Sequence, residues 1–279
     1  MRLLPLAFLA LAAVLLGCVS VNWENQTISA NISVPEGLNN TIPVEGIIGN
    51  ITASATPEIA VAPDKIKACI FGPHDAVIEG LFSDGVVFAG NAVAIDATWL
   101  TNNAKPADVE DCAIIMLNDG GEGRYLDYVP RTAIKQRISS GAGLLVSREA
   151  GTLVHDDNAV RGWEYVLAGV VPVSLPESPA NLTVNATFVT VTAGGALEGT
   201  EPFNVTDLNV TDINLGNGEN AALFRTGPYQ TSVAYPAVVK GGSGRGLVYY
   251  VSFAPDAAPE VYKALVRFLA ADYLGKNFG

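Results

Sequence analysis

The sequence predicts an α/β protein with a doubly wound, mainly parallel sheet and an antiparallel C-terminal extension. The first observation is a set of short apolar runs, at 66–72, 112–118 and 143–146, that do not alternate with polar residues. Such runs are typical of strands covered on both faces, as in a parallel sheet. The second observation is that segments with helical spacing separate these runs, which indicates right-handed strand–helix–strand units.

A helix is predicted between Asp127 and Ser140. Asp127 is placed to cap its start, and Gly141 ends it. Its apolar side chains form one stripe, at Val129, Ala133, Ile134 and Ile138. Residues 75–81 form a weakly amphipathic segment, and weaker patterns predict a short helix over 163–167 and further strands over 86–88 and 92–95.

The antiparallel extension is predicted to follow Pro172. Residues 187-TFVTVT-192 alternate between polar and apolar side chains, as in a strand with one exposed face. Further short strands are predicted over 222–225, 234–239 and 247–253. Residues 241-GGSGRG-246 predict the turn into the last of these strands. The last predicted element is a helix that begins near Pro259 and ends at Gly275.

The first eighteen residues have the pattern of an export signal. Arg2 precedes an apolar stretch, Leu3 to Leu16, that is shorter than the ~20 residues of a membrane-spanning helix. The order Leu15-Leu16-Gly17-Cys18 resembles a lipobox, which implies a signal peptide over residues 1–17 and lipidation of Cys18. A plain cleaved signal and an uncleaved membrane anchor are the alternatives.

Residues 18–62 are predicted to be a glycosylated tether, and residues 63–279 a single α/β domain. The tether is rich in Asn, Thr and Pro and contains no basic residue. Eight N-glycosylation sequons gather in two groups, and both groups are predicted to be exposed. Their asparagines are Asn25, Asn31, Asn39, Asn50, Asn181, Asn185, Asn204 and Asn209. Sequons together with a lipobox suit an archaeal cell surface.

The acidic composition excludes one class of partner. The formal charge is −12, and removing residues 1–17 takes away one basic residue and no acid, which makes it −13. Such a surface repels phosphate backbones, so nucleic-acid binding is not expected. Solubility alone accounts for this charge, and a high-salt or cation-rich exterior suits it equally.

Cys69 and Cys112 each lie within a predicted buried strand. In an oxidising exterior they form a disulfide if the two strands are neighbours, and otherwise they remain two buried thiols. The two histidines, His74 and His155, give these cysteines no short ligand spacing, so no metal site is predicted. No cofactor is predicted either.

The order of motifs resembles the class I glutamine amidotransferase-like superfamily, especially its branches without amidotransferase activity. The matching motifs are 111-DCAIIMLND-119, 139-SSGAGLLV-146, 163-WEYVL-167 and 242-GSGRGLVYYVSF-253. The resemblance covers roughly residues 64–275 and implies a flavodoxin-like sheet.

That family's nucleophile is a cysteine on a sharp strand-to-helix turn, supported by a His and a Glu near the C-terminal strand. The corresponding turn here is Ser147-Arg148-Glu149, which has no cysteine, and no histidine follows the last strand. Glu260 matches the acid alone. The resemblance therefore implies a pseudoenzyme.

An alternative places catalysis at the same turn. Ser147 would be the nucleophile, His155 its base, and Asp156 the residue that orients His155. The usual G-x-S-x-G elbow is absent. In the competing interpretation Ser147 is a strand-end hydroxyl, and the segment from His155 to Asp157 caps the next short helix.

The same edge is also a candidate ligand site, because open α/β sheets bind ligands beyond the carboxyl ends of their strands. The candidate residues are His74, Asp119, Arg148, Glu149 and Asp157. Arg148 suits a carboxylate, and the acids suit a cation. Pairing of these charges with one another is the simpler explanation of their presence.

We therefore expect a lipid-anchored domain without catalysis on the extracellular face of the cytoplasmic membrane, which serves ligand binding or envelope assembly. The lipid at Cys18 is its predicted membrane contact, and the sequence does not specify a protein or small-molecule partner. One alternative is an exported serine-type hydrolase that uses Ser147 and His155. Another is a solute-binding lipoprotein of a transporter, which usually needs two α/β lobes.

Overall fold

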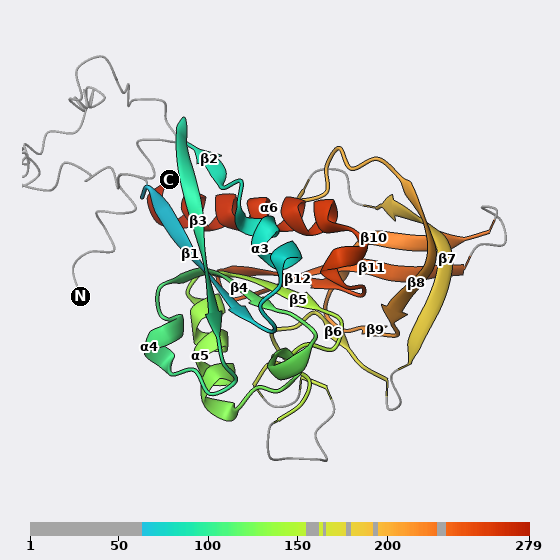
Figure 1. Ribbon diagram of the computed structural model, residues 1–279, viewed down its shortest axis with the longest axis horizontal. Coiled ribbons are helices and arrows are strands. Elements are labelled where there is room, and N and C mark those ends of the chain that lie inside the picture. The colour runs from blue at the N-terminus through green and yellow to red at the C-terminus, as the bar shows by residue number, and fades with distance from the viewer. Residues whose placement is uncertain (1–62, 155–161, 164–165, 177–179, 192–194, 228–232) are drawn as a thin grey trace, which may run out of the picture. The chain divides into compact units, whose positions relative to one another are not determined.

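Within the part of the chain that the computed structural model describes, ten strands form one mixed sheet in the order β2-β3-β1-β4-β5-β12-β11-β10-β7-β8 (Figure 1). The described residues are 63–154, 162–163, 166–176, 180–191, 195–227 and 233–279. The strands of this sheet are β1 (Lys65–Phe71), β2 (Val86–Phe88), β3 (Asn91–Leu100), β4 (Cys112–Leu117), β5 (Gly143–Ser147), β7 (Asn181–Thr190), β8 (Phe203–Thr211), β10 (Glu219–Thr226), β11 (Val233–Ser243) and β12 (Gly246–Val251). A separate short pair consists of β6 (Val173–Ser174) and β9 (Asn214–Leu215).

The pairings divide the sheet into a parallel half, with the antiparallel strand β2 at its outer edge, and an antiparallel half. Neighbours in the series β3, β1, β4, β5 and β12 are parallel. The pairings β2–β3, β12–β11, β11–β10, β10–β7 and β7–β8 are antiparallel. Antiparallel pairings are therefore the majority, and the prediction of a mainly parallel sheet is wrong. The coarser prediction, an α/β fold with an antiparallel part toward the C-terminus, is confirmed.

Part of the error arose at β8. This strand carries two sequons and has mostly exposed or half-buried side chains, and its sequence was predicted to be exposed and was not predicted to be a strand. Its pairing with β7 extends the antiparallel half by one more strand. A strand at the edge of a sheet needs apolar side chains on one face only, so its sequence contains few of the hydrophobic residues by which a strand is recognised.

Helices cover both faces of the parallel half. They are α3 (Ala76–Phe82), α4 (Pro106–Val109), α5 (Tyr128–Ser139) and α6 (Pro259–Phe278), with short 3₁₀ helices η1 (Gly121–Arg124) and η2 (Pro255–Ala257). Figure 1 shows α3 and α6 on one face and α4 and α5 on the other. Ile114 and Met116 of β4 belong to the core on the α6 face, and Ile115 and Leu117 belong to the core on the α5 face. Both faces of the strand are thus buried, which explains its non-alternating sequence. No helix among the described residues is long and apolar enough to cross a membrane.

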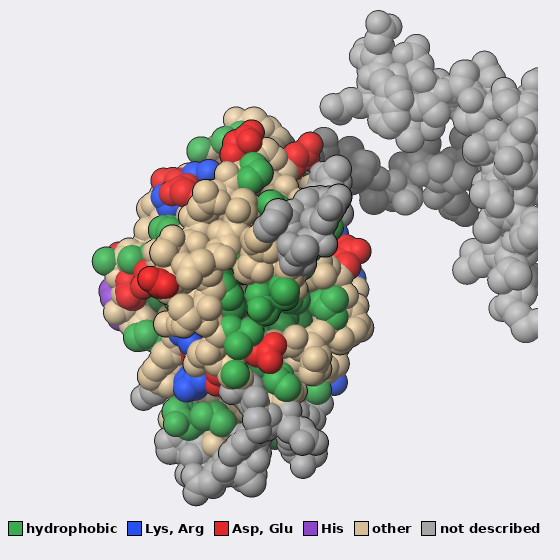
Figure 2. All heavy atoms as spheres, turned by 90° about the vertical axis from the view of Figure 1, so that its right-hand side faces the viewer, with side chains coloured by type: hydrophobic (Ala, Val, Ile, Leu, Met, Phe, Trp, Pro, Cys, Tyr) green, Lys and Arg blue, Asp and Glu red, His purple; other side chains and the backbone are tan. Residues whose placement is uncertain are grey.

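The antiparallel half buries an aromatic cluster on one face. Phe188 of β7 stacks on Phe203 of β8 with ring centroids 4.8 Å apart, and it meets Phe224 of β10 edge-on at 5.7 Å. Phe224 in turn meets Phe253, which follows β12, at 5.4 Å. These contacts fix which face of the β7–β8 ribbon is buried. Figure 2 looks onto this end of the sheet, where uncharged surface predominates.

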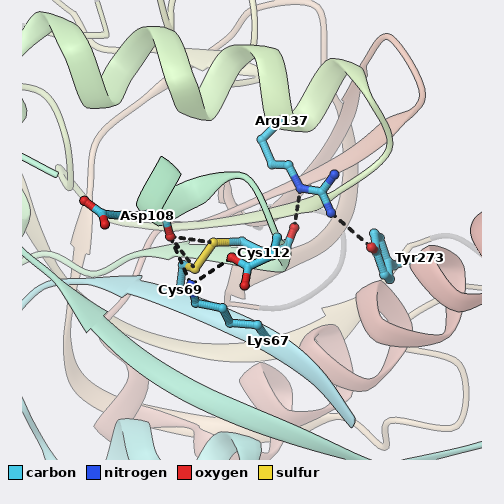
Figure 3. The surroundings of a disulfide bond; sticks show 7 residues. Lys67, Cys69, Asp108, Cys112, Arg137 and Tyr273 are labelled. Atoms are coloured by element: carbon cyan, nitrogen blue, oxygen red, sulfur yellow. Dashed lines mark hydrogen bonds and ion pairs between the residues drawn. A yellow bond between two sulfur atoms is a disulfide. The ribbon is translucent and has the colours of Figure 1, made fainter. Parts of the chain in front are cut away.

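A disulfide joins Cys69 of β1 to Cys112 at the start of β4 (Figure 3). Their Cα atoms are 5.8 Å apart, and both side chains are fully buried. The carbonyl oxygen of Asp108 lies 3.9 and 3.7 Å from the two Sγ atoms. Arg137 donates from Nε to the carbonyl of Cys112 over 2.6 Å and from Nη2 to the hydroxyl of Tyr273 over 3.0 Å. The bond therefore ties neighbouring strands together inside a packed environment.

Candidate functional site

The carboxyl ends of β1, β4 and β5 lie side by side. The backbone N–H of Asn118, just after β4, donates to the carbonyl of Phe71 at the end of β1 over 2.8 Å. The register of β4 and β5 pairs Leu117 with Val146, so the next residue, Ser147, lies beside the turn that follows β4. We call the polar residues gathered here the elbow site; its members are Asp119, Arg124, Ser147, Arg148 and Glu149.

The sequence allows two roles for Ser147, a catalytic nucleophile or a structural hydroxyl at the end of a strand. Its side chain is fully buried. The hydroxyl donates to Asn118 Oδ1 over 3.0 Å and accepts from the backbone N–H of Asp119 over 2.9 Å. Beside it, burial raises the pKa of Tyr262 well above its ordinary value, and a hydrogen bond with Ser147 lowers that pKa by less. The hydroxyl is thus engaged as donor and as acceptor inside the protein, which favours the strand-end interpretation.

Arg148 follows Ser147 in a left-handed backbone conformation, with φ of +51°. A residue with a Cβ adopts this region at a cost of about 1–2 kcal/mol. Two backbone hydrogen bonds hold the turn: Arg148 N donates to Val251 O over 2.8 Å, and Ala150 N donates to Ser147 O over 3.0 Å. Strain of this kind persists where surrounding contacts over-determine it, and it is common at functional sites. Arg148 is therefore the residue of this turn with a strained backbone, and its side chain is 22% exposed.

Asp119 is the centre of a charged network. Its Oδ1 lies 2.9 Å from Arg124 Nε, and its Oδ2 lies 3.6 Å from Arg148 Nε. Arg124 Nη2 also pairs with Glu149 Oε2, and Arg148 Nη2 donates to Asn181 Oδ1 on β7 over 2.9 Å. The Asp119 side chain is 7% exposed, whereas that of Arg124 is 36% exposed. The positive charges of the two arginines balance the negative charges of the two carboxylates, so the network has no net charge. The Arg124 side chain is its solvent-exposed part.

Two buried residues shape the loops beneath this network. Arg131 of α5 is 2% exposed, and its guanidinium donates to the carbonyls of Leu126 and Leu153, each over 2.8 Å. Gly123 packs so closely that a Cβ there would lie 2.0 Å from the carbonyl oxygen of Asn118. The loops after β4 and β5 are therefore held by specific contacts to α5 and to each other.

The remaining predicted site residues are distributed differently. His74 stacks on Trp99 of β3 with ring centroids 4.1 Å apart. His155, Asp156 and Asp157 lie outside the described residues, as do Cys18 and the first four sequons, so their roles stay predictions. The other sequon asparagines, Asn181, Asn185, Asn204 and Asn209, lie on β7 and β8. Across the described residues no cluster of three or more His, Cys, Asp or Glu side chains is arranged to hold a metal ion.

Three cavities lie at the opposite, amino ends of the parallel strands. One of about 650 Å³ is lined by the start of β3 and by α6 and includes Asp84 and Arg267. Cavities of about 380 and 390 Å³ lie beside the start of β1 and between α4 and α5. Asp84 and Arg267 pair with each other over 2.6 Å, and both are about half exposed. We place the candidate site at the elbow, because only there do strain, burial and a charged network coincide among these locations.

Comparison with known proteins gives a fold and no family. No family model and no curated protein matches the chain. A β-galactosidase from Rahnella sp. R3 is similar in structure, with a TM-score of 0.52 and 16% identity, over 74% of this chain and 31% of that chain. A ThuA-like protein from Bacteroides uniformis has a TM-score of 0.51 and 11% identity, over 80% of this chain and 96% of that chain. A cytoplasmic protein from Salmonella typhimurium LT2 has a TM-score of 0.51 and 13% identity, over 75% and 98% of the two chains.

At these identities the likeness shows the fold alone. The chain spans only 31% of the length of the Rahnella β-galactosidase. The assignment to the class I glutamine amidotransferase-like superfamily is wrong: no family model supports it, and β-galactosidases are among the similar structures. The comparisons support neither a lipoprotein nor an archaeal origin. The motifs behind the assignment describe apolar strand ends and glycine turns, which many parallel sheets share.

Sequence reasoning missed three residues of this region. Arg131 had a usable signal, because it shares a helical face with Ile134 and Ile138 and a charge on a buried face needs partners. The sequence identified Asn181 only as part of a sequon. Its contact with Arg148 joins β7 to the turn after β5, and such a long-range contact leaves no local pattern in the sequence. Arg124 ends the short 3₁₀ helix η1, whose sequence shows no periodicity, and no sequence signal could have paired it with Asp119.

Proposed function

We propose that this protein is an exported α/β domain that binds a small polar ligand at the elbow site and performs no catalysis there. The observation that carries the proposal is the arrangement of the turn after β5. Ser147 is buried and hydrogen-bonded, and Arg148 takes the strained position next to solvent.

The contacts of Ser147 argue against hydrolysis. A serine nucleophile needs a base to take its proton and free amides to bind the oxyanion. The proton of Ser147 is instead donated to Asn118 Oδ1, an amide oxygen that is no base at neutral pH. The backbone N–H of Asp119 already donates to the Ser147 hydroxyl, so it is not free for an oxyanion.

The charges of the network define the ligand that we propose. A ligand with a large net charge would leave one sign uncompensated in a partly buried site, which is costly. A zwitterion avoids this cost, because its carboxylate can meet Arg124 and Arg148 while its ammonium group meets Asp119 and Glu149. The proposed ligand class is therefore a small zwitterionic molecule.

The disulfide supports the proposed location outside the cytoplasm. Buried disulfides form and persist in oxidising compartments and are rare in the reducing cytosol. The bond between Cys69 and Cys112 fits export, and the signal-like start of the chain fits it independently. A lipid anchor at Cys18 remains the proposed route by which the domain is held at the extracellular face of the membrane.

A solute receptor of a transporter would also bind a small ligand, but such receptors usually close two lobes around it. All described residues belong to one unit, Ile59–Gly279. We therefore favour a single-domain binding module over a receptor with a hinge.

Thermal unfolding of the full chain tests the proposal. We would measure the melting temperature with zwitterionic amino acids, dicarboxylates, diamines and neutral sugars, each at millimolar concentration. We expect a zwitterion to raise the melting temperature and Arg148→Met to abolish the rise. Arg245→Met removes an exposed arginine that contacts α6 and should keep the full rise. A rise that survives Arg148→Met, or no rise with any ligand, would contradict the proposed site.

A further inference from the structure

We propose that the outer face of the β7–β8 ribbon is an N-glycosylated face, whose glycans cover the exposed edge of the ten-stranded sheet. The proposal rests on the export proposed above, because the enzymes that add such glycans act outside the cytosol. It goes beyond the presence of sequons, because it depends on where the fold places them.

On β7 the sequon residues share one face of the strand. Asn181, Thr183 and Asn185 are exposed and alternate with Val184 and Ala186, which are buried. Successive side chains in a strand point to opposite sides, so the two sequons of β7 present their asparagines on the same outer face.

On β8 the register places the other two asparagines opposite those sequons. Asn209 pairs with Thr183, and Asn204 pairs with Thr187. Thr183 Oγ1 donates to Asn209 Oδ1 over 3.1 Å, and Thr187 Oγ1 donates to Asn204 Oδ1 over 2.8 Å. Directly opposed residues of an antiparallel pair lie on the same face. The outer face of the ribbon therefore carries four sequon asparagines in two rows.

The hydrogen bonds of these asparagines are compatible with modification. The bonds to Asn204 and Asn209 use Oδ1, and so does the bond from Arg148 to Asn181. Asn185 Oδ1 likewise accepts from the backbone N–H of Asp207 over 2.9 Å. An N-glycan is attached at Nδ2 instead. In the transfer, Nδ2 forms a bond to the anomeric carbon of a lipid-linked oligosaccharide. The bond from that carbon to the lipid phosphate breaks, and the amide proton leaves with the released lipid phosphate.

The edge position of β8 gives the glycans a role. β8 is the last strand in the sheet order, so one side of its backbone has no strand partner among the described residues. Such an edge can pair with another copy of the chain unless it is protected, commonly by lysine, proline or bulges. β8 reads FNVTDLNVT and contains no lysine and no proline. Its protection is a shift in register near Asp207, which has φ of +51°, together with the sequons at Asn204 and Asn209.

The burial of Thr211 sets the order of events. Thr211 completes the Asn209 sequon and is 2% exposed, and its backbone N–H donates to the carbonyl of Ser252 over 2.8 Å. A transferase must read the threonine together with the asparagine. Glycan addition at Asn209 therefore precedes the folding of the β7–β8 ribbon.

Peptide mass spectrometry on the full chain purified from its native host tests the proposal. We expect glycans on at least one asparagine of β7 and one of β8, with the Cys69–Cys112 bond formed. A formed disulfide with four bare asparagines overturns the glycan face and leaves the export proposal intact. Reduced cysteines with bare asparagines overturn both.

A matched pair of variants tests the role of the glycans. Thr206→Ala destroys the Asn204 sequon, and Thr206→Ser keeps it. In chains that also carry Thr211→Ala, we expect the Thr206→Ala form to self-associate at least several-fold more in sedimentation velocity than the Thr206→Ser form. Equal self-association of the two forms, at equal folded fractions, overturns the role in edge protection.

Discussion

The hydroxyl of Ser147 donates a hydrogen bond to Asn118 Oδ1 over 3.0 Å, and so connects the end of β5 to the turn that follows β4. The same hydroxyl accepts from the backbone N–H of Asp119 over 2.9 Å. The first interaction is buried and the second is partly buried, so the serine is a structural bridge between two neighbouring strand ends. Its position beneath Arg148 makes it a support for the elbow site.

Ser147→Ala is therefore expected to lower the free energy of unfolding of the domain. Removing the hydroxyl leaves a buried amide oxygen and a backbone N–H unsatisfied, at a cost of about 1–3 kcal/mol. Urea unfolding at neutral pH measures the free energy of unfolding of the variant and of the parent. A variant as stable as the parent, or one that loses an esterase activity which the parent has, would contradict the structural role.

Substitutions at Arg148 separate the strain of the backbone from the contacts of the side chain. Arg148→Ala and Arg148→Gly both remove the guanidinium, but only glycine adopts φ of +51° without a Cβ penalty. After allowance for the greater entropy of unfolded glycine, we expect the Gly variant to be more stable than the Ala variant by about 0.5–1 kcal/mol.

The matched control for this comparison is Ala168→Gly, at an exposed turn position outside the left-handed region. There the glycine is expected to lower stability by a few tenths to about 1 kcal/mol. If Arg148→Ala proved the more stable of the two Arg148 variants, the strain at the elbow would be refuted.

The disulfide is expected to be a large part of the stability of the domain. Cys69 and Cys112 are separated by 43 residues in the sequence, and closing a loop of this length restricts the unfolded chain by about 4 kcal/mol in the entropic account. The double variant Cys69→Ala/Cys112→Ala should lose about 2–4 kcal/mol in the free energy of unfolding.

Burial of both sulfur atoms adds a second expectation for this bond. In the folded protein a mild reductant should leave the cysteines unreactive toward alkylation, and in denaturant both should react. Rapid alkylation of the native protein after mild reduction would show that the bond is more accessible than its burial implies.

Alkaline pH is expected to unfold the protein through its buried tyrosines. Burial raises the pKa of Tyr249 to about 12, and the nearby carboxylates of Asp272 and Glu219 add to the rise. Burial also raises the pKa values of Tyr250 and Tyr262. The stability from the raised pKa of Tyr249 is complete below about pH 10, where the unfolded tyrosine is also neutral. It is lost as the pH rises from about 10 through 12, because the unfolded chain releases its protons first.

Urea unfolding between pH 9 and pH 12 measures this loss. Tyr249→Phe should decrease the steepness of the decline above pH 10, by up to about 1.4 kcal/mol per pH unit. An identical decline in the variant would mean that Tyr249 ionises equally in the folded and unfolded states.

The parallel half of the fold was predictable because its signals are local. The apolar run 112–118 is β4 (Cys112–Leu117), and the predicted helix between Asp127 and Ser140 is α5 (Tyr128–Ser139). Gly141 follows this helix in a left-handed conformation, as its position predicted. Residues 163–167 were predicted as a helix, but Val166 and Leu167 lie in turns, and residues 164–165 are not described.

The antiparallel half and the elbow contacts were harder to predict, because they depend on pairings between distant segments. β8 alternates between apolar and polar residues, but a shift in register near Asp207 interrupts the alternation, and its two sequons indicated an exposed segment. The rim residues Asp119, Arg148 and Glu149 were predicted, but their arrangement depends on Arg124, which no periodicity identifies. Long-range partners of loop residues are fixed by the packing of the whole sheet, and a single sequence carries no direct record of them.

Intact-mass analysis with a serine-reactive fluorophosphonate tests most directly whether Ser147 at the elbow is an inert structural residue. The folded full chain would be incubated with the reagent beside its Ser147→Ala variant. The buried hydroxyl, bonded to Asn118, predicts that the parent gains no phosphonyl adduct that the Ser147→Ala variant lacks. An adduct on Ser147 of the parent, absent from Ser147→Ala, would contradict the account and restore the hydrolase.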